Sequence, residues 1–173
     1  MFEIFYPDCI AVSTYHIDFK KLYDEGCRGL IFDIDNTLVG HGAPADERSI
    51  KFFKELHSIG FKTLLLSNNR QERVKSFADR VESKYIYKAN KPSKGGYIKA
   101  MELMGTDRGN TVFVGDQLFT DVWGAKRSGI KTVLVGQLEK KEEIQIVLKR
   151  ILEKPILRLY RRSSHYKELN KRR

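Results

Sequence analysis

The sequence predicts an α/β fold with a Rossmann-like, doubly wound parallel sheet. Short apolar runs alternate along the chain with longer segments of helical periodicity. The apolar runs are continuous rather than alternating with polar residues, which is typical of parallel strands covered by helices on both faces. Strands and helices that alternate in this way build an open parallel sheet.

Five segments have the pattern of buried strands. They are 29–33, 62–66, 85–87, 111–115 and 131–135. Because the carboxyl ends of parallel strands meet at one edge of a sheet, the residues that directly follow these segments should form the ligand site.

Helical periodicity fills the intervals between the strands. Between 46 and 59, apolar residues recur on one face and Gly60 follows as a C-cap glycine. Pro155 should end the last helix, because proline interrupts the helix interior. The expected helices span 46–59, 70–81, 93–104, 119–128 and 140–152, and a hairpin flap is expected over 38–45.

The composition indicates one basic globular domain. The chain has 173 residues and two cysteines, which is too few for a disulfide framework. No run of about 20 apolar residues is present, and Glu3 stands where a secretory signal would be basic. We therefore expect a cytoplasmic protein with three parts: a lead-in over 1–28 with a short helix over 18–25, a catalytic domain over 29–153, and a basic tail over 154–173.

The net charge of +10 is concentrated near the C-terminus. The segment 149–173 has ten basic and two acidic residues, whereas the first 148 residues have 22 basic and 20 acidic ones. Such an asymmetry favours an anionic partner. The tail has three interpretations: contact with an anionic membrane surface, non-specific contact with RNA, or a solubilising end. The mixture of apolar and basic residues over 155–162 favours the membrane over nucleic acid.

Polar and charged side chains follow four of the five predicted strands. An oxygen-rich set without His or Cys indicates a hard cation, and we expect Mg²⁺. A lysine and a hydroxyl beside that cation suit a phosphate, and two carboxylates spaced as Asp-x-Asp suit a nucleophile and a general acid/base. The candidates are Asp33, Asp35, Thr37, Ser67, Asn68, Asn69, Lys91, Asp116 and Asp121.

These motifs, in this order, resemble the haloacid dehalogenase (HAD) superfamily of phosphatases. The stretches Asp-Ile-Asp-Asn-Thr-Leu, Ser-Asn-Asn, Lys-Pro and Gly-Asp-Gln-Leu-Phe-Thr-Asp are similar to the YqeG type of its subfamily IIIA. That group is in turn similar to the phosphatidylglycerophosphate phosphatases. The resemblance implies a Rossmann-like fold, phosphomonoester hydrolysis and a Mg²⁺ cofactor.

The resemblance implies a role for each residue of the first two motifs. Asp33 would be the nucleophile that forms an aspartyl-phosphate. Asp35 would be the general acid/base, with its backbone carbonyl on the metal. Thr37 would hold the loop, and Ser67 would bind the phosphoryl group together with the Asn68 backbone N–H. Thr37, Asn68 and Asn69 are the candidate phosphate-binding residues.

The last two motifs would complete the site. Lys91 would stabilise negative charge, and Asp116 would bind Mg²⁺ together with Asp33 and Asp35. Asp121 would act near the metal through water or by orienting Lys91. Gln117 departs from the pattern, because many HAD enzymes carry a second Asp there.

Simpler explanations remain for single residues. Ser67 could be a helix N-cap, and Asp121 could be an acid in the first turn of a helix that stabilises the dipole. His41 in the flap is best explained as a plain loop residue.

The motif spacing leaves no room for a cap domain. Asp33 and Ser67 are 34 residues apart, and Ser67 and Lys91 are 24 apart. We therefore expect a capless, open site that takes a large or lipid-bound phosphorylated substrate. The preferred hypothesis is a Mg²⁺-dependent phosphomonoesterase, with phosphatidylglycerophosphate as the leading substrate. The alternative is an RNA- or ribosome-associated binding protein with a vestigial or secondary phosphatase site.

Overall fold

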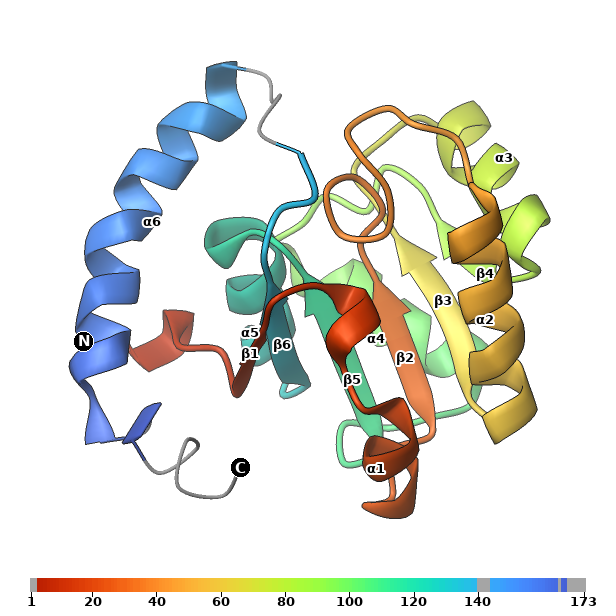
Figure 1. Cartoon of the computed structure of the whole chain (residues 1–173), viewed down its shortest axis with the longest axis horizontal. Helices are drawn as coiled ribbons and strands as arrows, with labels where there is room; N and C mark the ends of the chain where they lie inside the picture. The colour runs from red at the N-terminus through yellow and green to blue at the C-terminus, as the bar shows by residue number, and fades with distance from the viewer. Residues whose placement is uncertain (1–2, 140–143, 165, 168–173) are drawn as a thin grey trace.

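The computed structural model describes residues 3–139, 144–164 and 166–167, and within them it forms one six-stranded parallel sheet (Figure 1). The strand order is β1-β6-β5-β2-β3-β4. The strands are β1 Cys9–Ala11, β2 Gly29–Phe32, β3 Lys62–Leu66, β4 Lys84–Ile86, β5 Thr111–Gly115 and β6 Lys131–Val135. The predicted fold class is thereby confirmed.

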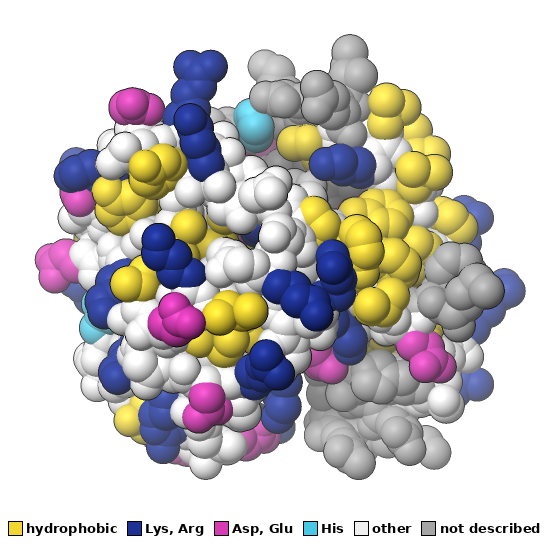
Figure 2. All heavy atoms as spheres, turned by 180° about the vertical axis from the view of Figure 1, so that it is seen from behind, with side chains coloured by type: hydrophobic (Ala, Val, Ile, Leu, Met, Phe, Trp, Pro, Cys, Tyr) yellow, Lys and Arg dark blue, Asp and Glu magenta, His cyan; other side chains and the backbone are white. Residues whose placement is uncertain are grey.

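The helices pack on both faces of the sheet, with α1 and α2 in front and α4 behind, while α6 stands at the β1 edge (Figure 1). Seen from the opposite side, Lys and Arg side chains are spread over the sheet domain as well as the α6 side (Figure 2). The helices are α1 Phe19–Asp24, α2 Glu47–Ile59, α3 Gln71–Val81, α4 Lys94–Met104, α5 Trp123–Arg127 and α6 Ile144–Arg162, with shorter turns η1 Glu3–Phe5, η2 Thr14–His16 and η3 Leu118–Val122.

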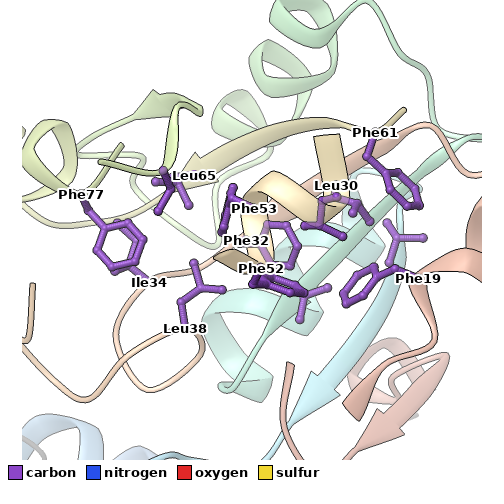
Figure 3. Packing of buried hydrophobic residues seen from close by; sticks show 14 of the residues in the cluster. Phe19, Leu30, Phe32, Ile34, Leu38, Phe52, Phe53, Phe61, Leu65 and Phe77 are labelled. Atoms are coloured by element: carbon purple, nitrogen blue, oxygen red, sulfur yellow. The ribbon is translucent and has the colours of Figure 1, made fainter. Parts of the chain in front are cut away.

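Alternate residues of the central strand β2 supply two separate cores. Phe32 packs with Phe52 and Phe53 of α2 in the front layer (Figure 3), with ring centroids 5.9 and 5.4 Å from that of Phe32. Ile31, its neighbour in sequence, belongs to the rear cluster with Tyr97 of α4. Successive strand residues point to opposite faces, so the continuous apolar run in β2 follows from the two covering layers.

Local capping explains why α2 begins and ends where it does. The Asp46 side chain accepts from the Ser49 backbone N–H at 2.7 Å, and the Ser49 hydroxyl accepts from the Asp46 N–H. At the other end Gly60 adopts φ 112°, a left-handed conformation that glycine allows without steric cost. These caps confirm the bounds expected for this helix.

Strand β1 was missing from the prediction. Its three residues, Cys9–Ala11, pair in parallel with β6 at the edge of the sheet, and all three are half-buried. A run this short has too few positions to show a period. The lead-in therefore extends the sheet by one strand.

The expected end of the last helix before Pro155 is wrong, because α6 continues through Pro155 to Arg162. Pro155 lacks the N–H that would bond to the Ile151 carbonyl. Two anchors beyond the proline, Ile156 and Tyr160, are buried against the body of the protein and offset that loss. The expected start of this helix, at 140–143, lies outside the described residues.

Two further expectations need correction. The segment 38–45 forms turns with one isolated bridge between Asp35 and Val39, and not a hairpin of two strands. The helix expected over 119–128 starts as one π-helical turn, η3, before α5. Among the described residues, no helix combines the length and apolar content needed to cross a membrane.

Candidate active site

The sheet order brings the predicted site residues to one edge. Strand β2 lies between β3 and β5, so Asp33 after β2 has the Ser67 loop on one side and the Asp116 loop on the other. The chain runs outward from β2 to β3 and β4 and then crosses back to β5 on the other side of β2, which makes this position a switch point of the sheet. Lys91 reaches the same point from the loop after β4.

Three buried carboxylates converge at this edge. Oxygen atoms of Asp33, Asp116 and Asp121 all lie within 4.8 Å of one another. Buried carboxylates repel each other strongly unless cations offset their charge. An all-oxygen donor set of this kind fits a hard divalent cation such as Mg²⁺.

Lys91 supplies a positive charge inside this cluster. Its Nζ donates to Asp33 Oδ1 at 2.6 Å and to Asp121 Oδ1 at 2.7 Å, and all three residues are buried. Burial alone would lower the pKa of Lys91, but the Asp121 and Asp33 carboxylates raise it above its usual value. The two carboxylates thus favour the charged form of Lys91.

The Asp33 carboxyl has a pKa raised to about 7. Burial is the main cause; Lys91 lowers the pKa, while Asp121 adds to the rise. Lys91 thus does not fully offset the effect of burial and of the neighbouring Asp121 on the pKa of Asp33. A second positive charge beside Asp33 would favour its ionised form, which is the form a nucleophile requires.

Asn68 holds the backbone of Lys91 from the neighbouring loop. Its side-chain carbonyl accepts from the Lys91 N–H at 2.7 Å, and its side-chain amide donates to the Lys91 carbonyl at 3.2 Å. The Lys91–Pro92 peptide bond is cis. We expected the Asn68 backbone N–H to bind phosphate; the structure adds a positioning role for its side chain.

Asp121 is held by the turn that carries it. Its second oxygen accepts from the Gln117 N–H at 3.1 Å, and the Val122 N–H bonds back to the Gln117 carbonyl across the π-helical turn. A Cβ on Gly115 would collide with the Asp121 carboxylate. Gly115 at the end of β5 is therefore what lets Asp121 approach Lys91, and single π-turns of this kind often mark functional sites.

Asp35 points to a different set of partners from Asp33. Its Oδ1 accepts from Arg73 Nη2 at 2.9 Å and from the Gly42 N–H at 2.9 Å, and its Oδ2 accepts from Asn69 Nδ2. Burial alone would raise the pKa of Asp35, but these three donors and the Arg73 charge outweigh it and lower the pKa. Asn69, expected at the phosphate, contacts Asp35 here.

Arg73 was not found by sequence reasoning. It lies in the first turn of α3, where nothing in its neighbours distinguishes it from a solvated helix arginine. Only the packing of α3 beside the β2 loop brings its guanidinium to Asp35. Its Nε is buried and has no hydrogen-bond partner in the described part of the chain.

Thr37 and Ser67 are both buried in the loops around Asp33. Thr37 Oγ1 donates to Asp116 Oδ1 at 3.3 Å, and the lead-in fixes its loop, since Thr14 Oγ1 donates to the Thr37 carbonyl at 2.7 Å. Ser67 Oγ accepts from the Asn69 N–H at 3.2 Å. The N-cap of α3 is Arg70, so the N-cap explanation for Ser67 does not hold.

Fold and site together define an α/β phosphatase of the HAD type, and the chain belongs to the haloacid dehalogenase-like hydrolases, whose family model matches residues 43–129. It is 35% identical over 164 residues to "Probable phosphatase YqeG" of Bacillus subtilis (strain 168), which covers 94% of this chain and 95% of that protein. It is 27% identical to phosphatidylglycerophosphate phosphatase 1, chloroplastic/mitochondrial, of Arabidopsis thaliana, over 82% of this chain but only 43% of that protein.

Solved structures share the fold. A cobalt-bound deoxy-D-mannose-octulosonate 8-phosphate phosphatase of Haemophilus influenzae superposes with a TM-score of 0.54 at 16% identity, over 66% of this chain and 70% of the other. An uncharacterised protein of Listeria monocytogenes serotype 4b gives a TM-score of 0.52 at 19% identity, over 68% and 86% of the two chains. These likenesses concern the α/β architecture alone.

Proposed function

We propose that this protein is a Mg²⁺-dependent phosphomonoester hydrolase that acts through an aspartyl-phosphate on Asp33. One observation carries the proposal: the Lys91 ammonium lies between the carboxylates of Asp33 and Asp121, and Asp116 completes the cluster. A nucleophilic carboxylate, a fixed cation and a metal-binding acid at one point are what phosphoryl transfer requires.

The metal would be held by Asp33, Asp116 and the backbone carbonyl of Asp35, with Asp121 acting through Lys91. When bound, Mg²⁺ would neutralise charge on the phosphoryl oxygens and favour the ionised nucleophile. The direct contact between Asp121 and Lys91 supports the second of the two roles expected for Asp121, the orientation of the lysine.

In the first step, an oxygen of Asp33 attacks phosphorus and the bond from phosphorus to the ester oxygen breaks. The departing oxygen takes a proton from Asp35. Lys91 and the Ser67 hydroxyl hold the phosphoryl oxygens during the transfer. Because Arg73 and Asn69 favour the ionised form of Asp35, this step requires their contacts to loosen as the ester binds.

In the second step, Asp35 takes a proton from water, and the water oxygen attacks phosphorus. The bond from phosphorus to Asp33 breaks, which releases inorganic phosphate and restores the Asp33 carboxylate. The Arg73–Asp35 pair suits this step, because a general base must be ionised to accept a proton.

We propose that the site is capless and takes a large or lipid-bound phosphate ester, with phosphatidylglycerophosphate as the leading candidate. The segment between Asp33 and Ser67 is occupied by α2 and β3, and the segment between Ser67 and Lys91 by α3 and β4. Neither segment has room for a cap domain. The similarity to phosphatidylglycerophosphate phosphatases supports the choice of substrate.

The catalytic proposal is tested by phosphate release from an aryl phosphate, with Mg²⁺ and with a chelator. We expect activity only with the metal, and its loss in Asp33→Asn. Asp24→Asn, an exposed carboxylate on α1, is the matched control and should retain full activity. Turnover by Asp33→Asn, or full activity without a divalent ion, would contradict the mechanism.

The substrate is tested separately, with a panel of lipid, nucleotide, sugar and protein phosphates. We expect phosphatidylglycerophosphate to give the highest kcat/KM. A higher value for a small soluble phosphate would reject the lipid substrate while leaving the mechanism intact.

A further inference from the structure

Helix α6 exposes a mixed apolar and basic face that the catalytic site does not use. We propose that this face, defined as Leu148, Ile151, Leu152, Pro155 and Leu159 with the basic residues Lys154, Arg158, Arg161 and Arg162, docks on an anionic phospholipid bilayer. The surface lies outside the catalytic machinery, so the proposal does not depend on the phosphatase mechanism.

The opposite face of α6 is fixed to the protein body. Glu153, Ile156 and Tyr160 are buried, and their spacings of three and four place them on one side of a helix. Glu153 Oε1 accepts from the Leu118 N–H at 2.8 Å, and the Tyr160 ring packs on Tyr6 with centroids 5.2 Å apart. Because these contacts fix the rotation of α6, the residues on its other side face away from the protein body.

The outward apolar residues form a continuous strip. Leu148, Ile151 and Leu152 are 58%, 53% and 62% exposed, and Leu159 is 45% exposed. They recur with Pro155 at spacings of three and four, so they lie along one side of the helix. Single exposed apolar residues are common, whereas a contiguous strip indicates a binding surface.

A basic strip runs beside the apolar one. Lys154, Arg158 and Arg161 follow each other at spacings of four and three, and all are exposed. The single acidic residue of α6, Glu153, is buried on the inner side. Figure 2 shows hydrophobic side chains gathered on the side of the molecule where α6 lies, with Lys and Arg along its outer edge.

An anionic bilayer satisfies both strips at once. A helix that lies in the membrane interface buries an apolar side among the acyl chains while its basic residues meet lipid phosphates. RNA would match the charges but would leave the apolar strip in water. A second copy of this chain, docked face to face, would bring the basic strips together.

The test is co-sedimentation of the full-length protein with vesicles. One set contains phosphatidylglycerol with phosphatidylcholine, and the other contains phosphatidylcholine alone. We expect binding to the first set that weakens with added salt and is much weaker on the second.

Two variants separate the contributions. Replacing Lys154, Arg158 and Arg161 by Gln should weaken binding by about a hundredfold, at roughly fivefold per charge. Replacing Leu148, Ile151 and Leu152 by Gln should weaken it by at least about tenfold. All six substituted residues are exposed, so both variants should release phosphate from a soluble aryl phosphate at the rate of the unmodified protein. That measurement serves as the check that the variants fold.

Matched controls lie on other faces. Lys20, Lys54 and Lys99 are exposed, and their replacement by Gln removes the same charge without touching α6. Val12→Gln is the control for the apolar variant, because Val12 is 79% exposed and lies outside α6. Both controls should bind vesicles like the unmodified protein.

Several outcomes would overturn the proposal: no binding to anionic vesicles, equal binding to both sets, or equal losses in the controls. Binding to RNA that depends on the basic strip, without vesicle binding, would assign the face to nucleic acid. A dimer in light scattering that the apolar variant disrupts, again without vesicle binding, would assign it to a second copy.

Discussion

The Arg73 guanidinium lies 2.9 Å from the Asp35 carboxylate, although the two residues are 38 positions apart and belong to different elements. The proposed acid/base of the site is thus held by the first turn of α3. Only 21% of the Arg73 side chain and 14% of the Asp35 side chain are exposed. Solvent therefore screens this pair less than it would a pair on the surface.

We predict that Arg73→Gln makes the protein less stable at neutral pH, by about 1 kcal/mol. The partners of Asp35 lower its folded pKa, so their stabilisation is present above the pKa of the unfolded chain and is lost as pH falls through the folded pKa. The difference in the free energy of unfolding between the variant and the parent should therefore vanish in acid. Urea denaturation at several pH values measures that difference.

Arg80→Gln on the same helix is the matched control, because Arg80 is exposed. It should leave the pH dependence of stability unaltered. We also expect kcat to fall by about tenfold in Arg73→Gln, since Asp35 loses a group that orients it. If the difference in the free energy of unfolding between Arg73→Gln and the parent persisted unchanged in acid, it would contradict the role assigned to the Arg73–Asp35 pair.

Lys91→Met should be strongly destabilising in the metal-free protein. The change leaves Asp33 and Asp121 buried without their shared cation, which costs about 3–5 kcal/mol. Chemical denaturation measures the loss. Because the deficit comes from carboxylate repulsion, Mg²⁺ should restore more stability to this variant than to the parent; equal gains would refute that account.

Asp116→Asn should have the opposite effect on the metal-free protein. Oxygen atoms of Asp116 lie within 4.8 Å of those of Asp33 and Asp121, so removal of one negative charge from this buried cluster should raise the free energy of unfolding by about 1–2 kcal/mol. The same change removes one of the proposed metal ligands. Without metal, the thermal unfolding midpoint of Asp116→Asn should therefore be higher than that of the parent, and Mg²⁺ should raise it little further. In the control Asp24→Asn, Mg²⁺ should raise the midpoint as much as in the parent.

Glu153→Leu should weaken the link between α6 and the active-site turn. Glu153 accepts from the Leu118 N–H, and Leu118 begins the π-helical turn that carries Asp121. A buried N–H without a partner costs about 1–3 kcal/mol. We expect urea denaturation to show a loss of that size in the free energy of unfolding, and Mg²⁺ to stabilise the variant less than the parent. The control is Glu153→Gln, which keeps an acceptor for the Leu118 N–H and should behave nearly like the parent.

Most of the sheet could be predicted because its pattern is local. The strands β3, β5 and β6 have the predicted bounds, since each is a continuous apolar run covered on both faces. Strand β1 was missed because three half-buried residues show no period. The end of α6 was misplaced because the rule for proline is local, whereas the anchors at Ile156 and Tyr160 act through tertiary contacts.

The candidate site divides in the same way. Parallel strands bring their carboxyl ends together, so Asp33, Ser67 and Asp116 could be placed at one edge from their positions in the sequence. The partners of Asp35 could not, because Arg73 and Gly42 reach it through the packing of a helix and the course of a turn. No local pattern encodes those distances.

The charge of the chain shows the same division. The sequence by itself determined how much positive charge the C-terminal segment carries, because that is a matter of counting. Only the tertiary structure decided that Glu153 is buried while Lys154 and Arg158 face outward, because the packing of Ile156 and Tyr160 sets the rotation of α6. Composition determines total charge, whereas the face on which charge is displayed depends on which side of each helix is buried.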